Sequence, residues 1–144
     1  MMPPPGKEER VRDIEIGATG RFELVIEPQH LASIFKDALL PPVLATPVMV
    51  MIMENAALNA IRPYLAPGES AVGTRVAVDH LAATPVGRRV VGEATVTKVD
   101  GRHISFAVTA RDEAEEIGRG THERLVIDIA RFTEKLAHKA APPA

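Results

Sequence analysis

The amino-acid sequence predicts an α+β domain in which one long buried helix is wrapped by a curved, mainly antiparallel sheet. Three observations favour this fold: a helical segment whose first two turns lack a polar stripe, four extended segments that follow it, and a length of 144 residues. One domain usually spans about 100–200 residues, so a single domain accounts for the chain. A helix that is apolar on all sides must be buried, and the extended segments are what can cover it.

The helical segment begins at Thr46-Pro47, which has the pattern of an N-cap followed by a proline in the first turn. An uninterrupted apolar run, Val48–Met53, comes next. The segment continues for about four turns before Pro63, and Pro67-Gly68 ends it. This is the central helix of the predicted domain.

Alternation of apolar and polar side chains predicts the extended segments. The N-terminal one covers residues 13–26, and a short helix at 29–39 separates it from the long helix. The later segments cover residues 70–82, 87–99, 102–112 and 116–132, with a tight hairpin turn at Asp100-Gly101. Because the last three follow one another as a meander, the sheet should be mainly antiparallel. Residues 1–12 and 134–144 are expected to be tails, so the predicted domain spans residues 13–133.

Composition excludes several classes of protein. The chain carries 17 Lys and Arg against 19 Asp and Glu, and 3% of its residues are aromatic, which argues against nucleic-acid binding. It has no cysteine, and its histidines show no metal-ligand spacing, so no metal is expected. The apolar run at 48–53 is far shorter than the roughly 20 residues that span a bilayer, and the N-terminus lacks the apolar core of a secretory signal. We therefore expect a cytoplasmic protein that binds neither membrane nor nucleic acid.

Three side chains are candidates for chemistry. Glu54 follows the apolar run of the buried helix, where a carboxylate is rare unless it is paired or functional; alternatively, this turn emerges at solvent or at a subunit interface. His80 ends a strand on the face of Val72 and Val78, so it is either a core histidine or a site residue beside a loop. Thr46 is either only a helix cap or a hydroxyl next to free backbone N–H groups that stabilise an oxyanion.

Thr46 and Glu54 are 54 − 46 = 8 positions apart, about 12 Å along a helix, so their side chains cannot bond directly. They would line one groove of the same chain or face a partner's groove across a dimer. His122 is a weaker candidate, because the glycines near it in the last strand permit close approach by a ligand or a neighbouring chain.

Three stretches together resemble a known family. They are LATPVMVMIMENAA (Leu44–Ala57), LAPGESAVGTRVAVDHLAATPVG (Leu65–Gly87) and IGRGTHERLVID (Ile117–Asp128). With the strands between them they cover about residues 13–132, and they resemble the hotdog-fold acyl-CoA thioesterases, specifically the branch similar to fluoroacetyl-CoA thioesterase. The resemblance implies a hotdog fold, in which a central helix is wrapped by an antiparallel sheet, and a homodimer whose interface holds the active sites.

The resemblance also implies thioester hydrolysis, in which acyl-CoA and water give a free acid and CoA. The family's catalytic threonine, glutamate and histidine correspond to Thr46, Glu54 and His80, and its substrate-binding glycine and arginine to Gly73 and Arg124. Glu54 would attack the thioester carbonyl or activate a water; His80 would polarise the carbonyl or assist proton transfer, and Thr46 would hydrogen-bond the reacting group. CoA is part of the substrate, so no separate cofactor is expected.

One departure concerns the acyl pocket. The fluoroacetyl-specific members have phenylalanines that form a lid before the catalytic threonine, whereas residues 37–46 here, DALLPPVLAT, contain no aromatic side chain. This implies a more open or aliphatic acyl pocket. Two other functions stay open at this point: a hotdog hydratase or dehydratase acting on acyl thioesters, and a non-catalytic module that binds acyl-CoA. Independently of the resemblance, a meander that ends in long strands leaves a sheet edge, and pairing with a second copy is the commonest way to cover it.

Overall fold

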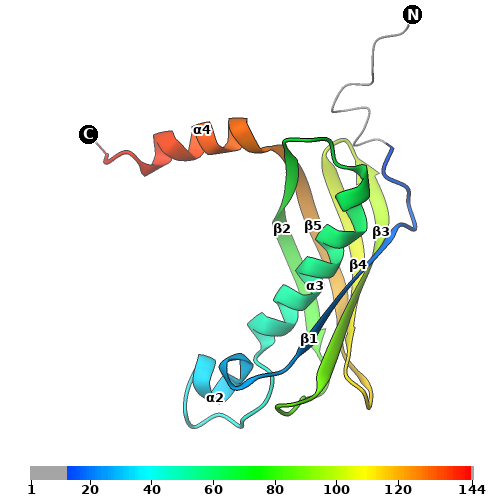
Figure 1. Ribbon diagram of the computed structural model, residues 1–144, viewed down its shortest axis with the longest axis vertical. Helices are drawn as coiled ribbons and strands as arrows, with labels where there is room; N and C mark the ends of the chain where they lie inside the picture. The colour runs from blue at the N-terminus through cyan, green and yellow to red at the C-terminus, as the bar shows by residue number, and fades with distance from the viewer. Residues whose placement is uncertain (1–12, 144) are drawn as a thin grey trace, which may run out of the picture.

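The computed structural model describes residues 13–143, so the tail expected at residues 1–12 lies outside the described residues. The elements, in chain order, are β1 (Thr19–Val25), η1 (Pro28–His30), α2 (Ala32–Phe35), α3 (Thr46–Ile61), η2 (Arg62–Tyr64), β2 (Glu69–His80), β3 (Arg89–Asp100), β4 (His103–Arg111), β5 (Glu116–Asp128) and α4 (Ile129–Ala140). The strands form one antiparallel sheet in the order β1-β3-β4-β5-β2. The sheet curls around α3, which lies across its concave face (Figure 1). This is the hotdog architecture that the sequence predicts.

Helix α3 forms the centre of the core. Its fully buried residues recur as pairs every four positions and so form a broad stripe along one side, while the residues between the pairs are half-buried: the stripe is Val48, Met49, Ile52, Met53, Ala56, Ala57, Ala60 and Ile61. They pack against the inward-facing side chains of the sheet, such as Val90, Ile104 and Phe106. The structure therefore confirms the prediction that this helix is buried and wrapped by strands.

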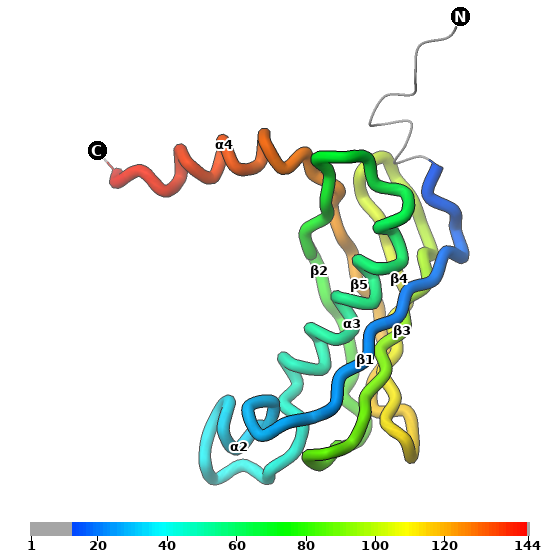
Figure 2. Tube along the Cα trace, in the orientation of Figure 1, coloured from blue at the N-terminus to red at the C-terminus, as the bar shows by residue number. Residues whose placement is uncertain are grey.

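Glycine lets the sheet approach α3 closely. A Cβ at Gly20 of β1 would overlap the carbonyl oxygen of Ala56 and the backbone nitrogen of Ala60, and one at Gly92 of β3 would lie 2.7 Å from Ile52 Cγ2. Both strands thus pass the helix at a distance that only glycine permits, and β1 lies beside α3 along much of its length (Figure 2).

Some predicted boundaries are wrong for local reasons. Ala45, not Thr46, is the N-cap of α3, and Thr46 is already in the helix with its side chain turned elsewhere. The extended segment expected from residue 13 pairs in the sheet only from Thr19, and the helix expected at 29–39 is reduced to η1 and the short α2. The last strand ends at Asp128 instead of running to residue 132, because the Asp128 side chain accepts a hydrogen bond from the backbone N–H of Arg131 and caps α4.

A bulge in β2 changes which of its side chains face α3. The pairing between β2 and β5 shifts between Gly73 and Arg75, so that Thr74 is an extra residue. Opposite residues in an antiparallel pair share a face. Before the bulge, residues 71 and 73 pair with 126 and 124 of β5; after it, residues 76, 78 and 80 pair with 122, 120 and 118. These β5 residues alternate along one strand and all face inward. Residues 71, 73, 76, 78 and 80 of β2 therefore lie on the same inner face. His80 therefore shares the inner face with Val78, as predicted, but not with Val72, which lies on the other face.

Helix α4 has no buried residue and extends away from the body, past the sheet edge formed by β2 (Figure 1). Its apolar residues Ile129, Phe132 and Leu136 recur at helical spacing and are 46%, 43% and 54% exposed. Across residues 13–143, every helix is too short or too polar to cross a bilayer.

We expect Gly20→Ala to lower the free energy of unfolding by about 1–3 kcal/mol, because the added methyl group displaces the backbone of α3. Denaturant unfolding measures this change. Thr19→Ala at the exposed neighbouring position is the matched control and should change stability by less than about 0.5 kcal/mol. Equal effects of the two substitutions would contradict the close packing of β1 on α3.

Candidate active site

Thr46 and His80, both predicted from the sequence as site residues, lie together. Thr46 is at the start of α3 and His80 at the end of β2, and Thr46 Oγ1 is 2.8 Å from His80 Nδ1. The Thr46 side chain makes no capping hydrogen bond to the helix, so its hydroxyl is engaged with the imidazole instead. We call these two residues the hydroxyl–imidazole pair.

His80 is placed to exchange a proton. Its side chain is half-buried, and desolvation lowers the pKa of the imidazole below the usual 6.5, so the ring is neutral near pH 7. Nε2 is buried and has no hydrogen-bond partner among residues 13–143. A buried polar atom without a partner requires an explanation, and a bound water or substrate is one that fits a site.

Glu54 and Arg124 form a second group at the middle of α3. Glu54 Oε2 is 3.6 Å from Arg124 Nη1, and the two side chains are 36% and 9% exposed. Glu54 is therefore only partly buried: its turn of the helix emerges towards the β2 edge, which was the alternative considered for it. Arg124 is fixed further by a 2.6 Å hydrogen bond from Nη2 to the carbonyl of Ala71, while its Nε is buried without a partner among the described residues.

Gly73 lies directly opposite Arg124 in the β2–β5 pairing. A Cβ at Gly73 would lie 2.8 Å from Glu54 Oε2 and 3.5 Å from Arg124 Nη1. Any larger residue would occupy the space in front of these two charges. We call Glu54, Arg124 and Gly73 the carboxylate–guanidinium group; its members are the other three residues predicted from the sequence.

His122 has a larger structural role than the sequence suggests. It is buried, its Nδ1 lies 2.8 Å from the carbonyl oxygen of Arg75, and its Nε2 lies 3.2 Å from Arg124 Nη1. Since the guanidinium can only donate, Nε2 accepts and Nδ1 carries the proton, which defines a neutral ring. The ring also stacks on Phe106, with centroids 5.8 Å apart. His122 thus orients Arg124, and its position two residues before Arg124 on the same strand face is the signal that could have identified it.

The two groups are separate within one chain. Thr46 and His80 bond each other at the N-terminal end of α3, whereas Glu54 lies two turns further on, about 12 Å along the helix axis. The structure therefore brings together Thr46 with His80, and Glu54 with Gly73 and Arg124, but not Glu54 with His80.

A cavity of about 410 Å³ opens beside the hydroxyl–imidazole pair. Its walls are mainly aliphatic, with Leu40, Val43 and Leu81 among the lining residues. Such an apolar hollow with a few polar groups is the usual form of a small-molecule site. The nearby aromatic side chain, Phe35 of α2, is 51% exposed.

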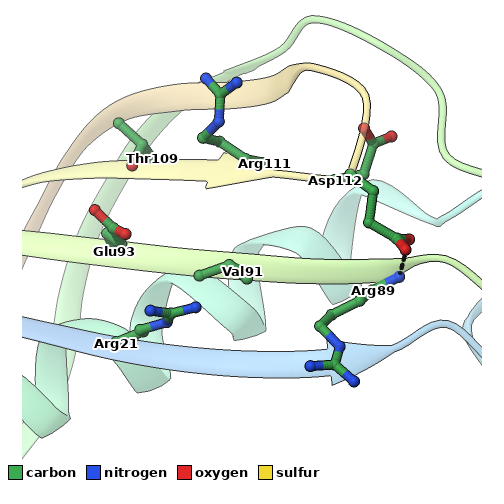
Figure 3. A pocket seen from close by; sticks show the side chains of 8 residues that line it. Arg21, Arg89, Val91, Glu93, Thr109, Arg111 and Asp112 are labelled. Carbon is green, nitrogen blue, oxygen red and sulfur yellow. Dashed lines mark hydrogen bonds between the residues drawn. The ribbon is translucent and has the colours of Figure 1, made fainter.

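A smaller hollow of about 260 Å³ lies on the outer face of β1, β3 and β4 (Figure 3). Two of its three arginines are paired: Arg21 and Arg89 both bond Glu23, at 2.6 and 3.4 Å, and the backbone N–H of Arg89 donates to Glu113. It lies on the face of the sheet opposite to α3, away from both groups described above. Among residues 13–143, no three His, Cys, Asp or Glu side chains are grouped to hold a metal ion.

Comparisons with known proteins show the family to which the chain is similar. The sequence model of a family described as fluoroacetyl-CoA-specific thioesterase matches residues 26–130. The fluoroacetyl-CoA thioesterase of Streptantibioticus cattleyicolor is 48% identical over 99 residues, which are 69% of this chain and 71% of that protein.

Solved structures give the same result. A structure of a fluoroacetyl-CoA thioesterase superposes with a TM-score of 0.83 at 38% identity, covering 89% of this chain and 98% of the other. A Thermus thermophilus protein described as a thioesterase superfamily member superposes with a TM-score of 0.82 at 31% identity, covering 88% and 93% of the two chains.

Burial of His122 makes stability depend on pH. Desolvation lowers the pKa of His122 below 6.5 in the folded protein, so the unfolded chain takes up a proton first as the pH falls. The free energy of unfolding should therefore be highest above pH 6.5 and decrease below it, by about 1.4 kcal/mol for each unit by which the pKa is lowered. In His122→Gln, the decrease of the free energy of unfolding that comes from protonation of His122 should be absent. Urea unfolding between pH 7.5 and 5.5 measures this decrease. His138→Gln, at an exposed position of α4, should keep the wild-type slope; an unchanged slope in His122→Gln would contradict the neutral buried ring.

Proposed function

This chain belongs to the fluoroacetyl-CoA-specific thioesterase family and is an acyl-CoA thioesterase, and we propose that Thr46, Glu54 and His80 form its catalytic site, with Gly73 and Arg124 binding the substrate. The reaction adds water to the thioester carbonyl and breaks the carbon–sulfur bond, giving a carboxylic acid and CoA. The proposal rests on two complementary groups that lie against the inner face of the edge strand β2. One is the neutral imidazole of His80, whose Nε2 has no partner among the described residues. The other is the carboxylate of Glu54 beside the guanidinium of Arg124.

The hydroxyl–imidazole pair supplies proton transfer. When Nδ1 of His80 carries the proton, it donates to Thr46 Oγ1 and leaves Nε2 free to accept a proton from water and return it to the leaving thiolate. A neutral ring is needed for the first of these steps, and the lowered pKa of His80 keeps the ring neutral near pH 7. Thr46 holds the ring in this orientation.

Glu54 supplies the negative charge that the reaction needs. Its carboxylate either attacks the thioester carbonyl and forms a mixed anhydride that water then hydrolyses, in which case the released CoA thiolate gains the proton that His80 takes from that water. Or it takes the proton of the attacking water in place of His80, and that proton then passes to the CoA thiolate. In both routes the guanidinium of Arg124 orients the carboxylate, and the absence of a side chain at Gly73 leaves room for the thioester in front of it. Arg124 Nε is a further donor without a partner among the described residues, available to the acyl group.

We propose that two copies combine to complete each site. β2 is an edge strand, and residues 73–77 in its middle are all exposed. We place β2 of the second copy antiparallel to β2 of the first, with the two-fold axis at Ala77. Val76 then lies opposite Val78 of the second copy. Because Thr74 is bulged out, the next inner-facing position, Gly73, then comes opposite His80 of the second copy. The hydroxyl–imidazole pair of one copy thus meets the carboxylate–guanidinium group of the other.

The charges on the outer face of β2 favour the same register. Arg75 then comes opposite Asp79 of the second copy, and within each chain Arg75 pairs with Glu123 of β5, and Asp79 with Arg119. Across the interface, the side chains therefore form a row in which negative and positive charges alternate. Glu123 and Arg75 come from one copy, and Asp79 and Arg119 come from the second. Opposite charges on directly opposed residues stabilise a strand pair by about 0.2–1 kcal/mol each.

The acyl group is proposed from the lining of the cavity. The walls beside Thr46 and His80 are aliphatic, from Leu40, Val43 and Leu81, and no aromatic residue occurs in residues 37–46. These features support an apolar acyl group and a wider choice than fluoroacetyl alone. Rates with acetyl-, fluoroacetyl-, propionyl- and longer acyl-CoA, followed by thiol release, would establish the preference.

Substitution tests the catalytic roles. We expect Glu54→Gln and His80→Ala each to lower kcat about 10²–10⁴-fold, because each removes a group that transfers a proton or attacks the carbonyl. The measurement is release of free thiol from acyl-CoA. Glu93→Gln, on the outer face of β3, is the matched control and should keep the wild-type rate. Full turnover by both Glu54→Gln and His80→Ala would show that the site is assigned wrongly.

The charge row tests the pairing of two copies. Arg75→Glu and Asp79→Lys each set like charges opposite one another twice in a homodimer, so each variant alone should dimerise more weakly, while an equimolar mixture should favour the heterodimer. Sedimentation of the separate and mixed variants, one carrying a mass tag, measures this. A wild-type monomer at micromolar concentration would contradict the dimer, and a mixture without preference would contradict the register.

A further inference from the structure

We infer that α4 is an arm that packs on the second copy of this chain, against the apolar surface beside the Thr46–His80 pair, where it forms a wall of the acyl cavity. The inference rests on the proposed pairing of β2 strands. It assigns a role to the C-terminal helix and to a surface at the opposite end of the molecule.

The first observation is that α4 covers little of its apolar face within its own chain: Phe132 lines an open hollow with Leu125 and Ile127 of β5, and Ile129 and Leu136 stay about half exposed. Its apolar stripe, Ile129, Phe132 and Leu136, is about half exposed along its whole length, and the helix has no buried residue. Isolated helices of about 12 residues are marginal in water, and the stability of an amphipathic helix comes mostly from packing of its apolar face. A helix of 12 residues with this stripe therefore requires a surface to cover it.

The second observation is a matching apolar surface that the body leaves uncovered. We call Leu40, Val43 and Leu81 the Leu40 patch; they line the 410 Å³ cavity next to Thr46 and His80. Leu40 is 42% and Leu81 49% exposed. The patch is at the end of the molecule that carries α2, whereas α4 departs from the other end (Figure 1). The α4 of the same chain extends away from it.

The third observation is the proposed register between the two β2 strands. It places the start of α4 in one copy at the same height along the sheet as the Leu40 patch of the other copy. α4 leaves the sheet after Asp128, which pairs with Glu69 at the start of β2. With Gly73 opposite His80, the proposed pairing sets Glu69 past the end of β2 of the second copy, beside the loop of residues 81–84 that follows His80. Thr84 belongs to the patch region, because its carbonyl accepts a 2.8 Å hydrogen bond from the backbone N–H of Leu44, and Val43 bridges Pro85.

The direction of α4 completes the geometry. The helix extends past the β2 edge, towards the side on which the second copy lies (Figures 1 and 2). Under a two-fold axis the contact occurs twice, with each α4 on the other copy's patch, as in any isologous interface. The occupant of the Leu40 patch is therefore α4 of a second copy.

The absence of cysteine allows a direct test by cross-linking. One protein carries Leu136→Cys on the apolar stripe, and a second, tagged protein carries Leu40→Cys in the patch. After mixing, exchange of subunits and mild oxidation, we expect a covalent heterodimer in several-fold higher yield than from the control mixture of His138→Cys with Leu40→Cys. His138 lies on the opposite face of α4, so the control differs only in the direction of the thiol.

The outcomes separate this inference from the proposed pairing. Equal yields from both mixtures, or no cross-link in a sample that sediments as a dimer, would overturn the docking of α4 while leaving the paired sheets intact. Cross-links only in species larger than a dimer would overturn it as well. A monomeric sample would refute the pairing itself.

A second measurement uses a variant that retains the body of the protein. Phe132→Asp places a charge on the stripe, and we expect it to lower the protection of α4, Leu40 and Val43 from amide hydrogen exchange and to raise KM for acyl-CoA several-fold. His138→Asp, which adds the same charge to the opposite face, should retain both the protection and KM. Identical exchange and kinetics in the two variants would contradict the inference.

Discussion

One extra residue in the edge strand, Thr74, decides which side chains of β2 face the central helix. Without the bulge, strict alternation would put Gly73 and His80 on opposite faces of the sheet, since they are an odd number of positions apart. With it, Gly73 lies in front of Glu54 while His80 reaches Thr46, and both point inward. The position of every candidate site residue on β2 depends on this single irregularity.

The two halves of the site differ in their electrostatics. At the start of α3, a neutral imidazole contacts a hydroxyl, with no formal charge in the pair. At its middle, a carboxylate lies against a guanidinium that is held by the carbonyl of Ala71 and by His122. Under the proposed pairing, hydrolysis then requires two copies, so that the rate per chain falls when the protein is diluted below its dissociation constant.

The sequence was informative where one physical requirement dominated. The apolar run Val48–Met53 predicted a buried helix, the alternation of the extended segments predicted the sheet around it, and the motif resemblance identified the family. For Thr46, one of the two roles considered, helix capping, is wrong, because a capping pattern does not reveal that an imidazole 34 residues away bonds the hydroxyl.

Other features depend on contacts that a single sequence does not display. The bulge at Thr74 has no compositional signature of its own, since threonine is an ordinary strand residue. The extent of burial of Glu54 depends on the open edge beside it, and the role of His122 depends on the partner chosen by Arg124. The start of α4 was detectable from Asp128 and the spacing of Ile129, Phe132 and Leu136, but the alternation of the preceding strand obscured it.

The other edge strand of the sheet, β1, limits how many copies of the chain join through their sheets. Its outward side chains include Arg21 and Glu23, which are bonded to each other, and Asn59 of α3 already donates to the carbonyl of Arg21. Pro28 follows soon after the strand ends. Charged side chains and occupied backbone groups discourage a further strand from adding to an edge. Polymerisation through successive sheets is therefore blocked at β1, and an assembly that grows through β2 is finite.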